Sequence, residues 1–242
     1  MHLTLGTQSF DLTTRALVVG TVEAAPSRAP ALVSDCAQRL VAEGADVVEV
    51  LAEEDEAIAA EFVAVVVARV AVPVAIASSR WQVLAAGYAA GAVLGSHGGH
   101  EAESDFLRAS AAAGASVILP CPPPAHEGSD RRPALMERAR RAEAAGIPRQ
   151  QIVVEPVVDR RLLRAARRVA ELGYPVLLTV SPSTLSTLAD EPGRDPDDDR
   201  ALALAATALA VTGGWRLVRT SDVKGVRRVC RVLAAVLEAG DR

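Results

Sequence analysis

Residues 31–51 read ALVSDCAQRLVAEGADVVEVL. Ala31–Glu43 has the apolar spacing of a helix, Gly44 follows it, and Asp46–Leu51 is a short, nearly continuous apolar run. A glycine just after the last helical turn favours the left-handed conformation that ends many helices. A short apolar run of this kind is typical of a parallel strand that helices cover. The stretch therefore predicts a helix that leads directly into a buried parallel strand.

The same unit recurs along the chain. The eight predicted strands are Ala16–Val22, Asp46–Leu51, Val72–Ala77, Ala92–Gly95, Ser116–Leu119, Ile152–Val154, Val176–Val180 and Arg216–Arg219. The predicted helices that follow them are Ala31–Glu43, Glu56–Val70, Trp81–Ala90, Glu103–Ala113, Ala134–Ala145, Arg161–Leu172, Arg200–Val211 and Val223–Glu238. Eight such units in 242 residues match the size of a (β/α)₈ TIM barrel in the α/β class. A doubly wound open sheet is the alternative, but no G-x-G-x-x-G follows the first strand.

Three further segments complete the predicted fold. His2–Leu5 and Gln8–Leu12 flank Gly6-Thr7, which predicts an N-terminal β-hairpin that covers the N-terminal end of the barrel. Pro120–Pro133 and the acidic Asp190–Asp199 follow the fifth and seventh strands, so we expect surface loops on the face where barrels build active sites. No change of composition divides the chain, and we expect one domain over residues 1–242.

Composition excludes several classes of protein. The 26 Lys and Arg against 30 Asp and Glu give a net charge of −4, and only 3% of residues are aromatic. A nucleic-acid protein needs a basic footprint, and often aromatic platforms. The longest apolar stretch, Phe62–Ala77, is interrupted by Arg69 and Pro73 and is too short to span a membrane. No signal peptide is visible, and three widely spaced cysteines indicate reduced thiols, so we expect a cytoplasmic protein.

The order of several motifs resembles the dihydropteroate synthase family, the pterin-binding barrels of folate synthesis. The resemblance rests on Glu43–Val50, Ala142–Arg149, Leu172–Leu177 and Leu217–Val223, which span most of the chain in the family's order. It implies a TIM barrel with a ligand site at the carboxyl ends of the strands. These motifs are mainly strand starts and helix ends, so they support a shared fold and say little about shared catalytic residues.

The first chemical motifs of the family are replaced. Where the family has L-N-V-T-P-D-S, this chain has Val22–Arg28, with Glu23 in place of the Asn that holds magnesium. Where the family has the Arg-bearing G-G-E-S-T-R-P, this chain has the acidic run Leu51–Glu56. The N-D pair of the fourth strand, which contacts the pterin, becomes Gly95-Ser96.

The later motifs also depart from the family. Glu155 stands for a pterin-contacting Asp, and Ser183 stands for the Lys of S-R-K-S. The final R-x-H-D motif keeps Arg219 and Asp222, although Ser221 replaces its His. The matching Arg of the family contacts pyrophosphate; the other interpretation is that Arg219 pairs with Asp222 or an acidic neighbour. For Glu155, the alternative interpretation is an acidic side chain in a loop, exposed to solvent.

These replacements predict a divergent synthase-like protein without synthase activity, a pseudoenzyme that acts by binding or association. A synthase stabilises a departing pyrophosphate with metal and cationic groups, and these are lost here. The alternatives are a pterin- or folate-binding protein, or a transferase with an altered substrate. We assign no catalytic residue; the candidate ligand-binding residues are Glu23, Glu155, Ser183, Arg219 and Asp222. We expect no cofactor, with magnesium only if residual pyrophosphate binding persists.

Partners and metals complete the expectations. A small pterin-like or phosphate ligand, and association with another folate enzyme, follow from the resemblance. The family also implies a homodimer through the late helices Arg200–Val211 and Val223–Glu238, both rich in Ala, Leu and Val. The candidate metal ligands are His97, His100, Cys121 and His126. The alternative is that flexible glycines account for the His97–His100 loop and that no metal binds.

Overall fold

The computed structural model describes residues 1–242 except 25–28, 53–54, 99–102, 122–129, 190–194 and 241–242. The strands are β1 (His2–Leu5), β2 (Gln8–Asp11), β3 (Leu17–Glu23), β4 (Val47–Leu51), β5 (Val74–Ser78), β6 (Leu94–His97), β7 (Ser116–Pro120), β8 (Ile152–Glu155), β9 (Leu177–Thr179) and β10 (Leu217–Thr220). The helices are α1 (Pro30–Glu43), α2 (Glu56–Val67), α3 (Trp81–Ala89), α4 (Glu103–Ala112), α5 (Arg132–Ala144), η1 (Arg149–Gln151), α6 (Arg160–Arg164), α7 (Ala166–Ala170), α8 (Pro182–Leu188), α9 (Pro196–Thr212) and α10 (Val223–Gly240).

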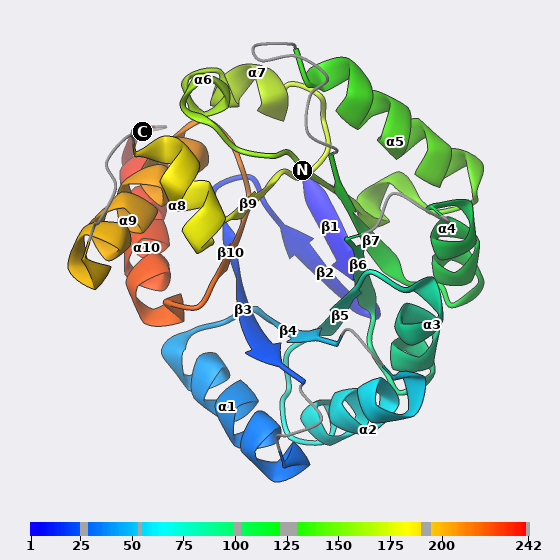
Figure 1. Cartoon of the computed structure of the whole chain (residues 1–242). Coiled ribbons are helices and arrows are strands. Elements are labelled where there is room, and N and C mark those ends of the chain that lie inside the picture. The colour runs from blue at the N-terminus through cyan, green and yellow to red at the C-terminus, as the bar shows by residue number, and fades with distance from the viewer. Residues whose placement is uncertain (25–28, 53–54, 99–102, 122–129, 190–194, 241–242) are drawn as a thin grey trace.

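Eight parallel strands form a barrel inside a ring of helices (Figure 1). Their order is β8-β7-β6-β5-β4-β3-β10-β9. The two outer strands of this order meet through one parallel bridge, Val154 with Val176, and through a 2.9 Å hydrogen bond from Val154 N to Pro175 O. The (β/α)₈ prediction is therefore confirmed, and the open-sheet alternative is excluded by the contact between β8 and β9.

The predicted strands and helix stops agree with the structure. Each of the eight predicted strands overlaps an observed strand of the barrel. Gly44 has φ 107°, and the glycines after the third, fourth, fifth and sixth predicted helices have positive φ as well. A side chain is strained in this region, which is why glycine stands there. The sequence thus places each strand–helix unit along the chain correctly.

Three elements differ from the sequence prediction. The segment predicted as one helix over Arg161–Leu172 forms two short helices, because Ala165 leaves the helical backbone at φ −96° and ψ 15°. Helix α8 is absent from the sequence prediction; the hydroxyl of Ser181 accepts a hydrogen bond from Thr184 N and starts it. The acidic segment is partly helical: Asp195 caps α9, so this helix begins at Pro196, before the predicted Arg200.

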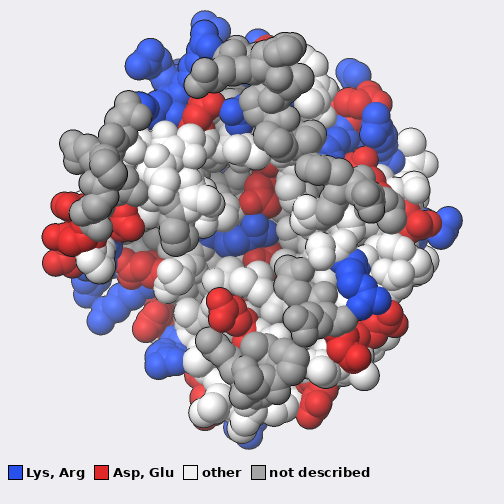
Figure 2. Space-filling view, viewed as in Figure 1, with Lys and Arg blue, Asp and Glu red and all other residues white. Residues whose placement is uncertain are grey.

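The N-terminal hairpin closes one end of the barrel, as predicted. β1 and β2 are antiparallel, and Leu3, Leu5 and Leu12 are at most 1% exposed. They pack into the barrel interior against inward side chains that include Leu17, Val47, Leu94, Ile118, Val153, Leu177 and Leu217. Ser116 Oγ also donates a 2.6 Å hydrogen bond to Thr4 O, which ties the hairpin to β7. The opposite, carboxyl end of the strands is the open mouth that Figures 1 and 2 view.

Candidate functional site at the barrel mouth

The inward-facing side chains change character along the barrel axis. Near the hairpin they are apolar, and two residues further along, six of the eight strands carry a polar inward residue. Because alternate residues of a strand point to the same side, Val47 and Glu49 both face the interior, as do Leu217 and Arg219. The polar layer at the mouth consists of Thr21, Glu49, Ser96, Glu155, Thr179 and Arg219. The candidate site is therefore built from inward residues near the carboxyl ends of six strands.

Arg219 lies at the centre of this layer and contacts two carboxylates. Its Nη2 donates to Glu49 Oε1 at 2.8 Å, and its Nε lies 2.8 Å from Glu49 Oε2. Its Nη1 donates to Glu155 Oε1 at 2.8 Å and to Thr179 Oγ1 at 3.1 Å. Arg219 Nη2 also donates to Ser96 Oγ at 3.2 Å. The guanidinium group is therefore held on both sides.

The cluster of Arg219, Glu49 and Glu155 is buried and holds more acidic than basic groups. Glu49 is fully buried, and Glu155 and Arg219 are each 13% exposed. Burial raises the pKa of Glu49, although the nearby charge of Arg219 opposes the shift. Burial alone would lower the pKa of Arg219, but the carboxylates of Glu155 and Glu49 raise it overall. With both carboxylates ionised, one cation faces two anions; Figure 2 shows basic atoms between acidic atoms at the centre of the mouth.

A cavity of about 510 Å³ opens above this layer. Its polar wall includes Arg219, Glu49 and Glu155, and its apolar wall includes Leu51, Ala77 and Val180. Within the described residues, Glu155 Oε2 is buried and has no hydrogen-bond partner. A smaller adjoining cavity of about 260 Å³ shares Glu155 and Thr179. The size suits a small organic molecule, and the buried carboxylate oxygens favour a ligand that donates hydrogen bonds.

The other candidate ligand-binding residues lie outside the polar layer. Glu23 is exposed at the end of β3. Ser183 is exposed on α8, where it lines the smaller cavity. Asp222 pairs instead with Arg200, at 2.7 Å, and accepts a 2.9 Å hydrogen bond from Gly225 N in the first turn of α10. The structure therefore brings together Glu155 and Arg219 from the predicted set and places Ser183 on the smaller cavity that Glu155 also lines. Glu23 and Asp222 line neither cavity.

The predicted metal ligands are partly outside the described residues, where His100 and His126 lie. His97 is buried and faces the helix layer, since its ring stacks on Phe106 with centroids 5.2 Å apart. Cys121 is buried and lines the smaller cavity; burial raises the pKa of its thiol. Among the residues that the structure describes, no three His, Cys, Asp or Glu side chains gather as a metal site would require.

Glu49 is a central residue of the candidate site that sequence reasoning missed. It stands in a motif that we assigned to the scaffold, within the otherwise apolar strand Val47–Leu51. A lone charged residue inside such a strand was the available signal, because burial of a carboxylate requires a partner. Thr179, which hydrogen-bonds to Glu155, was also missed, because it lies within the predicted strand Val176–Val180.

Fold and site together define a (β/α)₈ barrel with a ligand-sized, polar mouth at the carboxyl ends of its strands. Among solved structures, dihydropteroate synthase from Xanthomonas albilineans is similar over 98% of both chains, with a TM-score of 0.86 and 26% identity. The synthase of Thermus thermophilus in complex with 4-aminobenzoate has a TM-score of 0.82 and 25% identity, over 98% of this chain and 100% of that one.

Sequence comparison gives the same family. "Inactive dihydropteroate synthase 2" of Mycobacterium bovis is 32% identical over 106 residues, which are 40% of this chain and 33% of the relative. A probable bifunctional folylpolyglutamate synthase/dihydropteroate synthase of Haloferax volcanii is 34% identical over 90 residues, 34% of this chain and 10% of the relative. No protein-family model matches the chain. The matched stretch thus spans about a third of the Mycobacterium relative's length. The chain is thus similar to dihydropteroate synthases over its whole fold, and to part of the sequence of proteins that carry this name.

In the part of the chain that the structure describes, no helix is both long and apolar enough to cross a membrane.

Proposed function

We propose that this chain is a pseudoenzyme of the dihydropteroate synthase family, which binds a ligand at the barrel mouth without catalysing the synthase reaction. The observation that carries the proposal is the engagement of Arg219 by both Glu49 and Glu155. Among the described residues that line the mouth cavity, Arg219 is the one cationic side chain. A departing pyrophosphate needs uncompensated positive charge, and here the described lining has an excess of one negative charge.

The direct test is synthase turnover with a pterin pyrophosphate and p-aminobenzoate. We expect no dihydropteroate formation above the uncatalysed rate, with or without magnesium. An active member of the family, assayed in parallel, serves as the positive control. Turnover within about tenfold of an ordinary enzyme rate of ~10 s⁻¹ would contradict the proposal.

A pterin-like ligand is the second candidate, favoured by the buried Oε2 of Glu155, which has no hydrogen-bond partner among the described residues. A carboxylate accepts two hydrogen bonds from the edge of an aminopyrimidine, so Glu155 would bind such a ring as an acceptor. We expect a pterin without phosphates to bind more tightly than its pyrophosphate ester, because the mouth repels anions. Calorimetric titration of both compounds measures this order, and tighter binding of the pyrophosphate ester would count against it.

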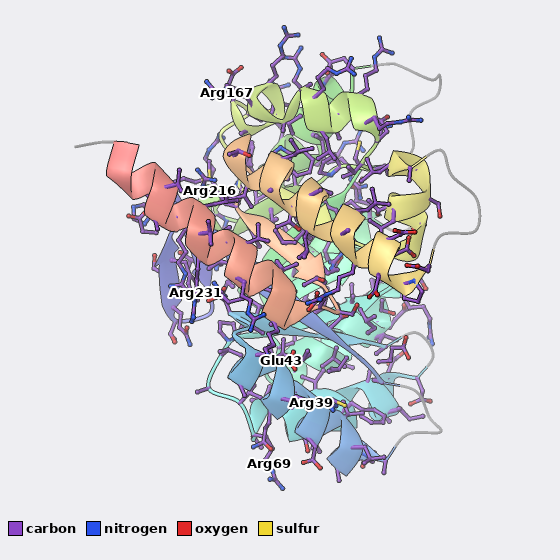
Figure 3. All side chains as sticks on the ribbon, turned by 90° about the vertical axis from the view of Figure 1, so that its left-hand side faces the viewer. Arg39, Glu43, Arg69, Arg167, Arg216 and Arg231 are labelled. Atoms are coloured by element: carbon purple, nitrogen blue, oxygen red, sulfur yellow. The ribbon has the colours of Figure 1, made fainter. Side chains whose placement is uncertain are left out.

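We also propose a homodimer through α9 and α10. These helices lie side by side on one flank of the barrel (Figure 1), and Figure 3 views this flank directly. α10 extends past the hairpin end of the barrel (Figure 3). Among the described side chains of the two helices, the large exposed apolar ones are Leu209, Val232 and Val236, at 59%, 63% and 62% exposure. Large apolar side chains at such exposure on two neighbouring helices favour an interface there.

A further inference from the structure

A second cavity lies at the rim of the barrel, outside the mouth. It is about 240 Å³ in volume and lies between the start of α5 and the pair α6 and α7. Its charged lining consists of Asp130, Arg131, Arg132, Asp159, Arg161 and Arg168, and none of these residues lines the mouth cavity. Figure 2 shows basic atoms gathered over this part of the rim. The cavity is thus a separate, arginine-rich site in a chain whose net charge is −4.

The two carboxylates of the cavity are already paired. Asp130 accepts hydrogen bonds from Arg132 Nε at 3.0 Å and Nη2 at 2.7 Å. Hydrogen bonds from Arg132, with a smaller effect of the charge of Arg168, lower the pKa of Asp130. Asp159 accepts from Arg131 Nη2 at 2.7 Å and from Leu162 N at 2.7 Å. Each aspartate therefore neutralises one arginine of the cavity.

Arg161 and Arg168 remain uncompensated. Within the described part of the chain, neither guanidinium group has an ion-pair or hydrogen-bond partner, and both side chains are exposed toward solvent. Four arginines against two aspartates leave a charge of +2 on the described lining. The first turn of α5 contains no acidic residue, so the positive end of that helix adds to the same potential.

Arg131 is the independent indication of a ligand. It is only 9% exposed, and although Nη2 binds Asp159, its Nη1 is buried without a hydrogen-bond partner among the described residues. A buried donor that lacks an acceptor costs about 1–3 kcal/mol, and more for a charged group. An oxyanion in the cavity would supply the missing acceptor. An anion in the cavity would therefore complete the hydrogen bonding of Arg131.

We propose that this cavity binds a phosphate group, either as the free ion or on a small ester. The charge of +2 matches a phosphate, which carries about −1.5 to −2 at neutral pH. Guanidinium groups donate in pairs to phosphate oxygens, and a phosphate carries more negative charge than a carboxylate monoanion. The volume lies below the roughly 300–1,000 Å³ of sites for drug-sized ligands, which fits a phosphate with few further atoms.

The same helices offer a matched control. Arg164 on α6 and Arg167 on α7 are exposed, but they do not line the cavity. Arg167 extends from the outer surface of its helix (Figure 3). Removal of these two arginines changes the net charge as much as removal of Arg161 and Arg168. If the basic surface attracted anions without a built site, the two pairs of substitutions would therefore weaken binding equally.

The test is titration calorimetry of the full chain with inorganic phosphate at low ionic strength. We expect the double variant Arg161→Ala/Arg168→Ala to lose at least about tenfold in affinity, since both arginines supply charge and donors to the anion. We expect Arg164→Ala/Arg167→Ala to stay within about twofold, as is usual for exposed charges. Equal losses in the two double variants, or no phosphate binding by the unmodified chain, would overturn the proposal.

Two further ligands define the chemistry. Methyl phosphate that binds as well as inorganic phosphate assigns the site to a phosphate ester, and binding of the free ion alone assigns it to inorganic phosphate; both outcomes support the site. Acetate that binds as tightly as phosphate would refute the preference for a dianion. Arg131→Lys keeps the positive charge but loses the paired N–H donors of the planar guanidinium group. We therefore expect weaker phosphate binding at a similar thermal unfolding midpoint.

Discussion

The guanidinium group of Arg219 contacts both carboxylate oxygens of Glu49, with Nη2–Oε1 and Nε–Oε2 distances of 2.8 Å. The two residues lie on β10 and β4, which are separated in the sheet by β3, so the ion pair crosses the barrel interior. Glu155 approaches the same guanidinium group from β8. The positive charge of Arg219 is thus neutralised within the protein.

Replacement of Arg219 by Met should destabilise the fold by about 3–5 kcal/mol at pH 8, because it leaves buried carboxylates without their cation. The pKa of Glu49 is already raised by burial, and loss of Arg219 would raise it further. The folded variant would then bind a proton that the unfolded chain releases above its pKa of about 4.3. Its stability should therefore fall as the pH rises from about 5 to about 8. Urea unfolding at several pH values measures this dependence.

The control for this variant removes the carboxylates as well. Arg219→Met combined with Glu49→Gln and Glu155→Gln should lose the added pH dependence, since no buried acid remains at the centre of the mouth. If Arg219→Met alone is as stable at pH 8 as at pH 5, relative to the unmodified chain, the three side chains do not form the buried ion cluster described above.

Gly95→Ala should destabilise the chain by at least about 2 kcal/mol, as overpacking of a core does. A Cβ on Gly95 would overlap the hydroxyl oxygen of Tyr88 and lie 2.7 Å from its Cζ. Tyr88 cannot move away easily, because it is 9% exposed and its hydroxyl lies 2.8 Å from Ser110 Oγ. Thermal and chemical unfolding measure the loss.

Gly98→Ala is the matched control, since a Cβ there meets nothing within 4 Å and the backbone does not have a positive φ. We expect its stability to lie within about 0.5 kcal/mol of the unmodified chain. The added substitution Tyr88→Phe should restore the stability of Gly95→Ala only in part, because the Cζ ring carbon remains too close to the new Cβ. Equal stability of the two alanine variants would contradict the packing of α3 on β6.

The fold was predictable because each strand–helix unit is encoded locally, in an apolar run, a helical period and a terminal glycine such as Gly44. The site was predictable only in part. Arg219 was identified by its place at a strand end and in a retained motif, and Glu155 by its match to a family motif, whereas Glu49 was assigned to the scaffold. Its pairing depends on barrel closure, which brings together residues 170 positions apart in the sequence. The spacing of residues along the sequence does not predict such a long-range contact.

The pairing of Asp222 shows the same limit. Proximity in sequence suggested that Arg219 pairs with either Asp222 or another acid, and the structure selects other acids. Asp222 follows β10 and turns toward the start of α10, where it binds Arg200. A residue just past a strand end faces the helix layer as readily as the mouth, and local sequence does not decide between these directions.

Cysteine reactivity tests the burial pattern. Burial raises the pKa of Cys230 to about 11 and also raises the pKa of Cys121, whereas Cys36 is partly exposed. Since the thiolate is the reactive form, we expect an alkylating reagent at pH 8 to label the native chain rapidly at Cys36 alone. Mass spectrometry should show one rapid adduct, and three in denaturant. Rapid native labelling that persists in Cys36→Ser would show that a second thiol is accessible.

Leu209→Asp should convert the proposed homodimer into monomers, because it places a charge in an apolar interface on α9. Light scattering at micromolar concentration should give a mass near twice 25.2 kDa for the unmodified chain and near 25.2 kDa for the variant. Leu32→Asp is the matched control: Leu32 on α1 is 60% exposed and Leu209 is 59% exposed, so neither substitution disturbs the core. We expect Leu32→Asp to stay dimeric. A monomeric unmodified chain would refute the dimer itself, whereas a Leu209→Asp variant that stays dimeric would move the interface away from α9.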